Sequence, residues 1–225
     1  MASLYPMWDL AIHNKLESSY VNGPGNRAVI WVQGCMLACP GCWNPDTHAF
    51  KQNTLTNHDE LVSWINRQKD IEGVTFSGGE PLHQIVQICR LIEDVKMSRK
   101  DLSFGIFTGY TLQEAQDGNY KSFHFDETIN EFILNRPDFG TYNWIRLKEN
   151  LDFAIMGRYN KKLPSTNPML GSSNQMIWTF DRPDGTSRYT TDDFGKTQQM
   201  EVQISDDGYV AITGFPTFHL EERVI

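Results

Sequence analysis

The feature that most constrains the fold of this chain is a regular alternation of short apolar stretches with amphipathic stretches. Runs of apolar, β-branched and aromatic residues predict buried strands over 27–34, 73–77 and 102–109. Apolar residues at helical spacing predict helices over 56–69 and 81–96. Strands that alternate with helices predict an α/β fold with a parallel sheet and right-handed crossovers.

The remainder of the chain is less regular. A further helix is predicted over 126–136 and a fourth buried strand over 151–156, whereas residues 137–150 show no clear pattern. Apolar and polar residues alternate over 200–214 on either side of Gly208, which predicts a β-hairpin.

The change in pattern near residue 176 predicts two parts. The first is a core domain over 1–176, and the second is a C-terminal extension over 177–225 that carries the hairpin. The approach to the hairpin, 181–199, is polar and rich in turn-forming residues, so we expect a loop there.

Composition excludes several classes of protein. The 225 residues carry a formal net charge of -8 without a block of Lys or Arg, so a nucleic-acid partner is not expected. With 40% hydrophobic residues and no apolar run near the roughly 18 residues of a membrane span, no membrane association is expected either. The first residues lack the features of a secretory signal, and we expect a cytoplasmic protein.

Three of the four cysteines lie close together, at Cys35, Cys39 and Cys42. A disulfide framework is not favoured in an α/β chain of this type without a secretory signal. A zinc site of these three cysteines and His48 is chemically reasonable, although paired C-x2-C motifs are more usual. The third interpretation is an iron–sulfur cluster in which three irons have thiolate ligands and the fourth iron has no protein ligand.

The spacing Cys35-x3-Cys39-x2-Cys42 after a strand resembles that of radical S-adenosylmethionine enzymes. This resemblance implies a [4Fe-4S] cluster whose open iron binds the amino and carboxylate groups of S-adenosylmethionine. One electron then breaks a carbon–sulfur bond and yields methionine and a 5'-deoxyadenosyl radical. The cofactor carries the chemistry, and the protein orients it.

A second candidate stretch, "FSGGEPLH" over 76–83, follows the next predicted strand, at the edge where parallel α/β sheets bind ligands. In radical enzymes of this kind such a stretch meets the amino group of S-adenosylmethionine, which makes Gly78, Gly79 and Glu80 candidates for that contact. The alternative for this stretch is an ordinary strand-to-helix turn. Trp43 is a candidate for packing near the adenine, and its alternative is a plain core aromatic. The remaining Cys89 lies on a predicted apolar helix face and indicates packing, and neither His48 nor His83 is assigned a role.

Further stretches narrow the resemblance. The chain contains, in order, "VNGPGNR" (21–27), "CPGCWN" (39–44), "SGGEPLH" (77–83) with "TGYTL" (108–112), and "GSSNQ" (171–175). In this order they resemble the activating proteins of anaerobic ribonucleotide reductase, relatives of the pyruvate formate-lyase activating enzymes. The resemblance implies an incomplete parallel β/α barrel with one [4Fe-4S] cluster bound by the three cysteines, and places Gly41, Trp43 and Gly79 along S-adenosylmethionine.

The same resemblance implies an oxidoreductase that abstracts hydrogen from a glycine of a large glycyl-radical enzyme, with a flavodoxin-type electron donor. Two positions depart from the family pattern, Met156 in place of an acid and Leu170 in place of an arginine. These departures, an insertion around 115–150 and the extension keep two alternatives open. One is a radical enzyme that modifies a peptide or small metabolite, and the other is a non-catalytic zinc or iron–sulfur interaction module.

Overall fold

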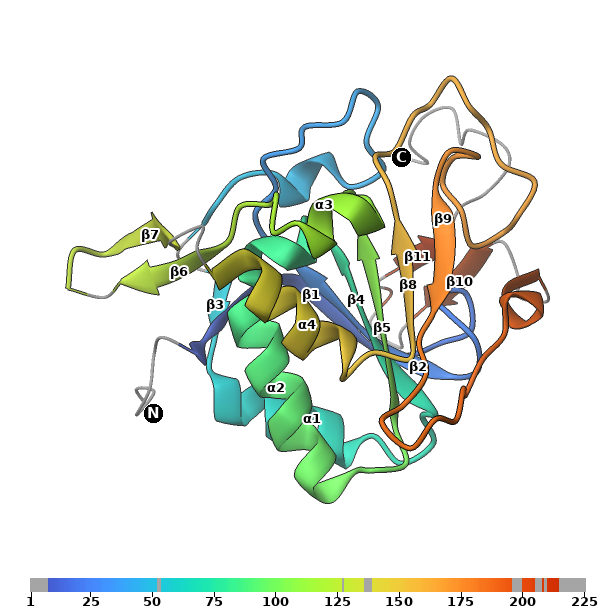
Figure 1. Cartoon of the computed structure of the whole chain (residues 1–225), viewed down its shortest axis with the longest axis horizontal. Helices are drawn as coiled ribbons and strands as arrows, with labels where there is room; N and C mark the ends of the chain where they lie inside the picture. Colours follow the sequence, from blue (N-terminus) through green and yellow to red (C-terminus); the bar gives the residue numbers. More distant parts are fainter. Residues whose placement is uncertain are drawn as a thin grey trace.

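A computed structural model describes residues 8–51, 54–126, 128–135, 139–195, 200–204, 208 and 210–214. A seven-stranded sheet forms the centre of the described part of the chain (Figure 1). In spatial order its strands are β3 (Leu55–Thr56), β1 (Leu10–Ser19), β2 (Arg27–Val32), β4 (Gly73–Gly78), β5 (Ser103–Thr108), β8 (Phe153–Met156) and β9 (Met176–Thr179).

Strands β2, β4, β5 and β8 are parallel neighbours, with Ile30 opposite Phe76 and Phe76 opposite Ile106. This confirms the predicted α/β fold with a parallel sheet. Strands β1, β3 and β9 add antiparallel edges, and none of these three strands was predicted. Among the described strands no hydrogen-bonded pair joins β3 to β9, so the sheet has two free ends.

In the described ranges the α-helices between the strands are α1 (His58–Arg67), α2 (Ile85–Ser98), α3 (Leu112–Gln116) and α4 (Gly140–Lys148). Figure 1 shows them together on one face of the sheet. Helix α1 begins where the Asn57 side chain accepts a hydrogen bond from the backbone N–H of Glu60, which satisfies a donor that the first turn leaves unpaired. The helix predicted over 81–96 begins instead with a 3-10 turn, Pro81–Gln84, in which Pro81 takes a first-turn position where its missing N–H leaves no bond unmade.

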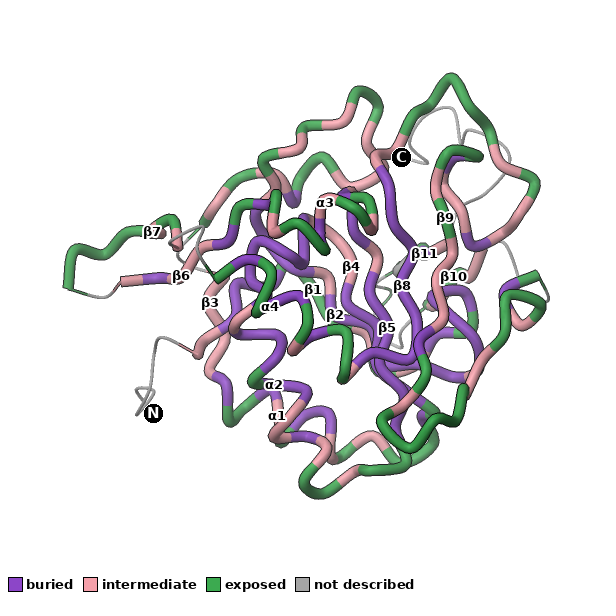
Figure 2. The backbone as a smooth tube through the Cα atoms, in the orientation of Figure 1, coloured by how far each residue is buried: buried purple, intermediate pink, exposed green. Residues whose placement is uncertain are grey.

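The core fills both faces of the sheet (Figure 2). On the helical face, Ile30 of β2 and Phe76 of β4 pack with the apolar sides of α1, α2 and α4. The predicted apolar face of α2 is confirmed, since Ile85, Ile88, Cys89 and Ile92 are all 0% exposed. On the other face, Phe153 and Ile155 of β8 pack with Phe194 of the C-terminal part. Strands buried on both faces explain why their sequences are continuously apolar.

The helix predicted over 126–136 is wrong. The described residues 126 and 128–134 of this stretch belong to a hairpin of β6 (Phe123–Asp126) and β7 (Glu131–Leu134), whose described turn residues are 128–130. The Asp126 side chain accepts a hydrogen bond from the backbone N–H of Thr128, and Asn130 has a φ of 57°. Asp and Asn favour such turns because their side chains bond nearby backbone and tolerate the left-handed conformation. Helix α4 lies within the stretch that the sequence left unplaced.

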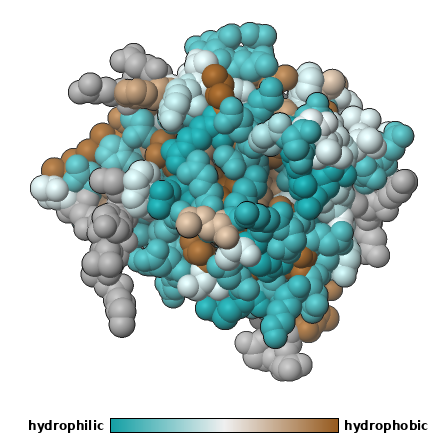
Figure 3. Space-filling view, turned by 60° about the horizontal axis from the view of Figure 1, so that its bottom comes forward, coloured by the Kyte–Doolittle hydropathy of each residue, from teal (hydrophilic) through white to brown (hydrophobic). Residues whose placement is uncertain are grey.

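The β6–β7 hairpin projects from the molecule at the left of Figure 1. Hydrophobic residues gather along it in the space-filling view (Figure 3), and Ile129 and Leu134 are 55% and 52% exposed. This hairpin lies within the insertion around 115–150 that the sequence analysis expected.

The predicted C-terminal hairpin is confirmed as β10 (Met200–Ile204) and β11 (Val210–Gly214), with Gly208 at a φ of 84° between them. One side of the hairpin contacts the segment that precedes β2. The Glu201 carboxylate accepts a hydrogen bond from the backbone N–H of Tyr20, and the Asn22 side-chain amide donates one to Thr213. The division into a core over 1–176 and an extension over 177–225 stays a prediction.

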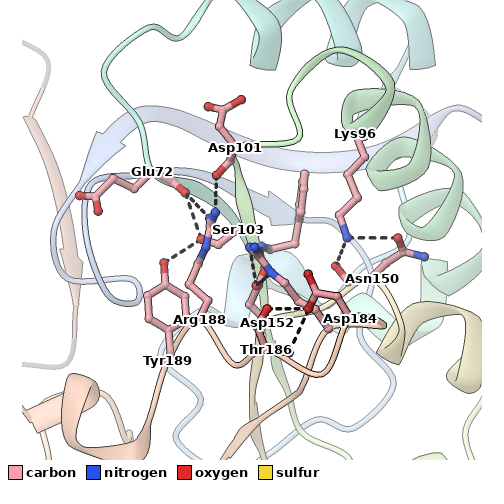
Figure 4. A network of polar contacts seen from close by, with 12 residues as sticks. Glu72, Lys96, Asp101, Ser103, Asn150, Asp152, Asp184, Thr186, Arg188 and Tyr189 are labelled. Carbon is pink, nitrogen blue, oxygen red and sulfur yellow. Dashed lines mark hydrogen bonds and ion pairs between the residues drawn. The ribbon is translucent and has the colours of Figure 1, made fainter.

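The described part of the segment between β9 and β10, residues 180–195, contacts the amino-terminal ends of β4 and β5. The Tyr189 and Ser103 hydroxyls are 2.9 Å apart, and Arg188 donates to the backbone carbonyl of Asp101 at 2.7 Å (Figure 4). Nearby, the Arg182 guanidinium pairs with the Asp152 carboxylate at 3.1 Å. Apart from a short 3-10 turn over Thr191–Gly195, most of the described part of the predicted loop is irregular.

No helix in the described ranges has the length and apolar character needed to cross a lipid bilayer.

Candidate functional site

One cavity opens at the carboxyl-terminal ends of β2, β4, β5 and β8, where parallel sheets of this type bind ligands. The structure brings together here seven of the eight residues that the sequence singled out. The cavity is lined by Cys35, Cys39, Cys42, Trp43, Gly78, Gly79 and Glu80, among others. Gly41 lies beside the cavity wall in an exposed turn, with a φ of 74°.

The cysteine loop begins where β2 ends and is pinned at its base. Gly34 donates a backbone hydrogen bond to Thr47 at 2.7 Å, and Cys35 donates one to His48 at 2.9 Å. Gly34 has a φ of 99°, and a Cβ there would lie 2.7 Å from the Phe50 ring, so a larger residue would be strained. These two hydrogen bonds join the beginning of the loop to residues 47 and 48, so the three cysteines lie in a loop that is closed at its base.

The thiols receive backbone N–H groups. The N–H of Asn44 lies 3.4 Å from the Cys42 sulfur, and the N–H groups of Leu37 and Ala38 act on the Cys35 thiol. Burial nevertheless dominates and raises the pKa of Cys35 to about 11. Burial also raises the pKa of Cys42 above its ordinary value. The raised pKa values favour the protonated form of the Cys35 and Cys42 thiols at neutral pH, and these two thiols would release protons on binding iron.

The two glycines of the "SGGE" turn have a packing reason. A Cβ on Gly78 would lie 2.8 Å from the Trp31 backbone, and one on Gly79 would lie 2.6 Å from the Gly34 carbonyl oxygen. Glu80 in turn donates a backbone hydrogen bond to the same Gly34 carbonyl at 3.0 Å. The turn that follows β4 therefore lies directly against the base of the cysteine loop, which only glycine permits.

The Glu80 carboxylate joins β4 to the end of β5. It accepts hydrogen bonds from the Thr108 hydroxyl at 2.7 Å and from the backbone N–H groups of Leu82 at 2.8 Å and Gly109 at 2.9 Å. The residue is 1% exposed. Burial raises the pKa of this carboxyl to about 7, although the three donors and Arg158 favour its charged form.

Several cavity residues were not predicted individually. Tyr159 follows β8 and its ring lies 6.2 Å from that of Trp43, while Gln175 precedes β9 and donates to the Gly157 carbonyl at 2.9 Å. Thr108 and Gly109 end β5. The available signal was their position, because the ends of neighbouring parallel strands meet at one edge of the sheet.

The two departures from the family pattern lie in packed regions. Met156 is 1% exposed in the core cluster, and Leu170 packs against the cluster around Phe153. The fourth cysteine, Cys89, is fully buried on α2, which agrees with its predicted packing role. Burial raises the pKa of its thiol to about 12. His83 is also buried, with its Nε2 3.2 Å from the Tyr110 hydroxyl.

The cysteine arrangement fits an iron–sulfur cluster. In a cubane cluster each thiolate binds its own iron, so the three ligands lie around the cluster and do not converge on one point. In the part of the chain that the structure describes, no three His, Cys, Asp or Glu side chains are grouped to hold a single metal ion. Cys35, Cys39 and Cys42 all line one cavity, where they could bind different irons of one cluster.

Comparison with known proteins identifies the family. A family model described as a 4Fe-4S single cluster domain matches residues 21–178. A protein of Pasteurella multocida named anaerobic ribonucleoside-triphosphate reductase-activating protein is 32% identical over 169 residues, which cover 71% of this chain and 91% of that protein. This chain belongs to the family of those activating proteins. The predicted resemblance, and the prediction of an enzyme of the radical S-adenosylmethionine activating type, are thereby confirmed.

Other comparisons are less similar. The phage T4 protein of the same name is 27% identical over 165 residues, which cover 71% of this chain and 88% of that protein. A crystal structure of QueE from Escherichia coli matches with a TM-score of 0.39 and 19% identity, over 48% of this chain and 57% of that one. That likeness is too low to support an argument. The family membership rests on the sequence matches, which also support an iron–sulfur cluster in this chain.

Proposed function

We propose that this protein uses one [4Fe-4S] cluster and S-adenosylmethionine to generate a glycyl radical on a partner reductase. The observation that carries the proposal is the single cavity in which the three cysteines meet the "SGGE" turn at the carboxyl edge of the parallel strands. Membership of the activating-protein family supplies the partner class, because the relatives' names refer to a ribonucleoside-triphosphate reductase.

In this proposal, Cys35, Cys39 and Cys42 hold the cluster by three of its irons. When bound there, the cluster and S-adenosylmethionine would supply one-electron chemistry that converts the partner's glycine into a glycyl radical, with methionine and 5'-deoxyadenosine as the products. The protein residues bind and orient the reactants and exclude water around them. A flavodoxin-type protein is the proposed source of the electron.

The cofactor contacts are proposed for Gly41, Trp43, Gly78, Gly79 and Glu80. Both glycines and Glu80 line the cavity beside the cysteine loop, which supports their contact with the methionine part of the cofactor. The two donors from the end of β5, the Thr108 hydroxyl and the Gly109 N–H, hold the Glu80 carboxylate and this turn against β5. The aromatic rings of Trp43 and Tyr159, 6.2 Å apart, form an apolar wall suited to the adenine.

The proposal is tested by anaerobic incubation with dithionite and S-adenosylmethionine, followed by measurement of 5'-deoxyadenosine. We expect cleavage by the reconstituted protein. We also expect only background product, together with loss of the cluster absorbance, after Cys35→Ala, Cys39→Ala or Cys42→Ala. Cys89→Ala is the matched control, because its buried thiol lies on α2 outside the cavity, and it should keep both cluster and cleavage.

Addition of a candidate reductase should give a glycyl-radical signal in electron paramagnetic resonance. Stoichiometric zinc without sulfide after anaerobic purification would contradict the whole proposal. Cleavage without a radical on any reductase would keep the cofactor chemistry and favour modification of a peptide or metabolite. Neither Met156 nor Leu170 favours that alternative, since both are used in packing.

A further inference from the structure

His48 is fixed to the cysteine loop through its backbone. It follows the short 3-10 turn Pro45–Thr47, and its N–H donates to the Pro45 carbonyl at 3.1 Å. Its carbonyl accepts the 2.9 Å hydrogen bond from the backbone N–H of Cys35. The position of the His48 ring is therefore coupled to the first of the three cysteines.

The side chain of His48 belongs to the cavity wall, together with Cys35, Cys39 and Cys42. Its Nε2 atom is shielded from solvent, and it has no hydrogen-bond partner among the described residues. Buried polar atoms nearly always have a partner, and an orphan in a binding cavity indicates that a bound group supplies it. The anionic sulfurs of a cluster on the three cysteines would supply acceptors of that kind in the same cavity.

A neighbouring contact shows that this loop directs donors at sulfur. The backbone N–H of Asn44 lies 3.4 Å from the Cys42 Sγ, within the same turn that leads to His48. We propose that the Nε2–H of His48 donates a hydrogen bond to a sulfur of the [4Fe-4S] cluster and raises the reduction potential of that cluster. The inference rests on the cluster of the proposed function, although it does not depend on the partner or on S-adenosylmethionine.

The physical reason is electrostatic. Reduction adds negative charge to the cluster, and a donor close to a cluster sulfur stabilises that charge more in the reduced form than in the oxidised form. His48 thus acts as a positioning residue on the cluster, and not as a catalytic one. It makes the cluster easier to reduce by a donor of given potential.

The test is a redox titration of the reconstituted protein, followed by electron paramagnetic resonance without S-adenosylmethionine. His48→Phe keeps a planar ring and removes the donor, so we expect unchanged iron and sulfide content and a lower midpoint potential. His48→Gln offers an amide N–H, and we expect it to restore part of the potential. His124→Phe is the matched control, because that ring lies on β6 and bonds Asn135, and it should leave the potential unchanged.

The possible outcomes separate the two proposals. A wild-type protein without stoichiometric iron and sulfide would contradict the proposed function itself. A wild-type cluster whose potential is the same in His48→Phe would overturn the role of His48 alone. Loss of the cluster in both His48 variants would also overturn it, because it would make His48 a ligand or a structural residue. Loss in His48→Phe with retention in His48→Gln would support a required donor.

Discussion

At the scale of single residues, the cavity depends on groups that the protein itself holds in place. Gly78 and Gly79 are small because the backbone of β2 and of the cysteine loop occupies the space of a side chain. Glu80 is buried because its carboxylate links two strand ends. These residues fix the distance between the turn after β4 and the cysteine loop, which is the distance that a shared ligand would span.

The raised pKa of Glu80 gives a prediction for the apoprotein. Its folded pKa of about 7 lies above the ordinary 4.5, so the fold favours the protonated form. Its stabilising contribution is present in full below the ordinary pKa and is lost as the pH rises to about 7. Glu80→Gln cannot titrate. We therefore consider the free energy of unfolding of the wild type minus that of Glu80→Gln. This difference should fall by up to roughly 3 kcal/mol between pH 4.5 and 7.

Chemical denaturation at a series of pH values measures this difference. Burial lowers the pKa of His83 to about 4, so His83 contributes a slope of opposite sign below pH 6.5 in both proteins. Subtraction removes that shared slope. A difference that is constant from pH 4.5 to 7 would show that the Glu80 carboxyl titrates normally in the fold.

At the scale of elements, the face of the sheet opposite the helices also carries buried aromatic and aliphatic side chains. The Phe153 ring of β8 lies over Gly105 of β5, where a Cβ would be 2.0 Å from the ring. The guanidinium of Arg27 lies 4.9 Å from the same ring and is fully buried. Its hydrogen bonds to Thr75 and Ser103 join β2, β4 and β5 at their amino-terminal ends.

Gly105→Ala should therefore destabilise the sheet. The methyl group cannot fit without moving Phe153, and such overpacking usually costs about 1–3 kcal/mol. Thermal or denaturant unfolding measures the loss. The exposed Gly195 has open space at its Cβ position, so Gly195→Ala is the matched control and should change the free energy of unfolding by less than about 1 kcal/mol. Equal effects of the two substitutions would contradict the packing described here.

At the scale of the whole molecule, the ligand site and the C-terminal part lie at opposite ends of the strands. The cysteine cavity opens at the carboxyl ends, whereas Tyr189 and Arg188 contact residues at the amino-terminal ends. Phe194 is 0% exposed, and its ring is 5.0 Å from that of Phe153. The segment after β9 thus completes the core of one sheet face while leaving the cavity edge open.

Phe194→Ala should lower the free energy of unfolding by about 3–5 kcal/mol, the usual effect of removing a buried aromatic side chain. Because the cavity is at the other end of the strands, the folded fraction should bind iron and sulfide as the wild type does. Ile204→Ala, at a side chain that is 71% exposed on β10, is the control and should have little effect on stability. Loss of cluster binding in folded Phe194→Ala protein would contradict this separation.

Elements whose signals lie within a short stretch of chain could be predicted from the sequence. Apolar runs marked β2, β4, β5 and β8, because strands buried on both faces have few polar residues. The cysteine spacing and the "SGGE" turn predicted two parts of the site, because each motif lies within one short stretch. The turn signal of the β6–β7 hairpin is also local. The spacing of the apolar residues around that turn nevertheless fits a helix, and only the strand pairing shows a hairpin.

Which residues line the cysteine cavity together depends on the folded arrangement of the chain. Tyr159, Gln175 and Thr108 reach the cavity because parallel strands bring distant chain segments to one edge, and no short stretch contains that information. The orphan Nε2 of His48 likewise depends on what surrounds the ring. Burial and hydrogen bonding are properties of neighbours in space, so they set the pKa of Glu80 and the role of Gly78 only after the chain has folded.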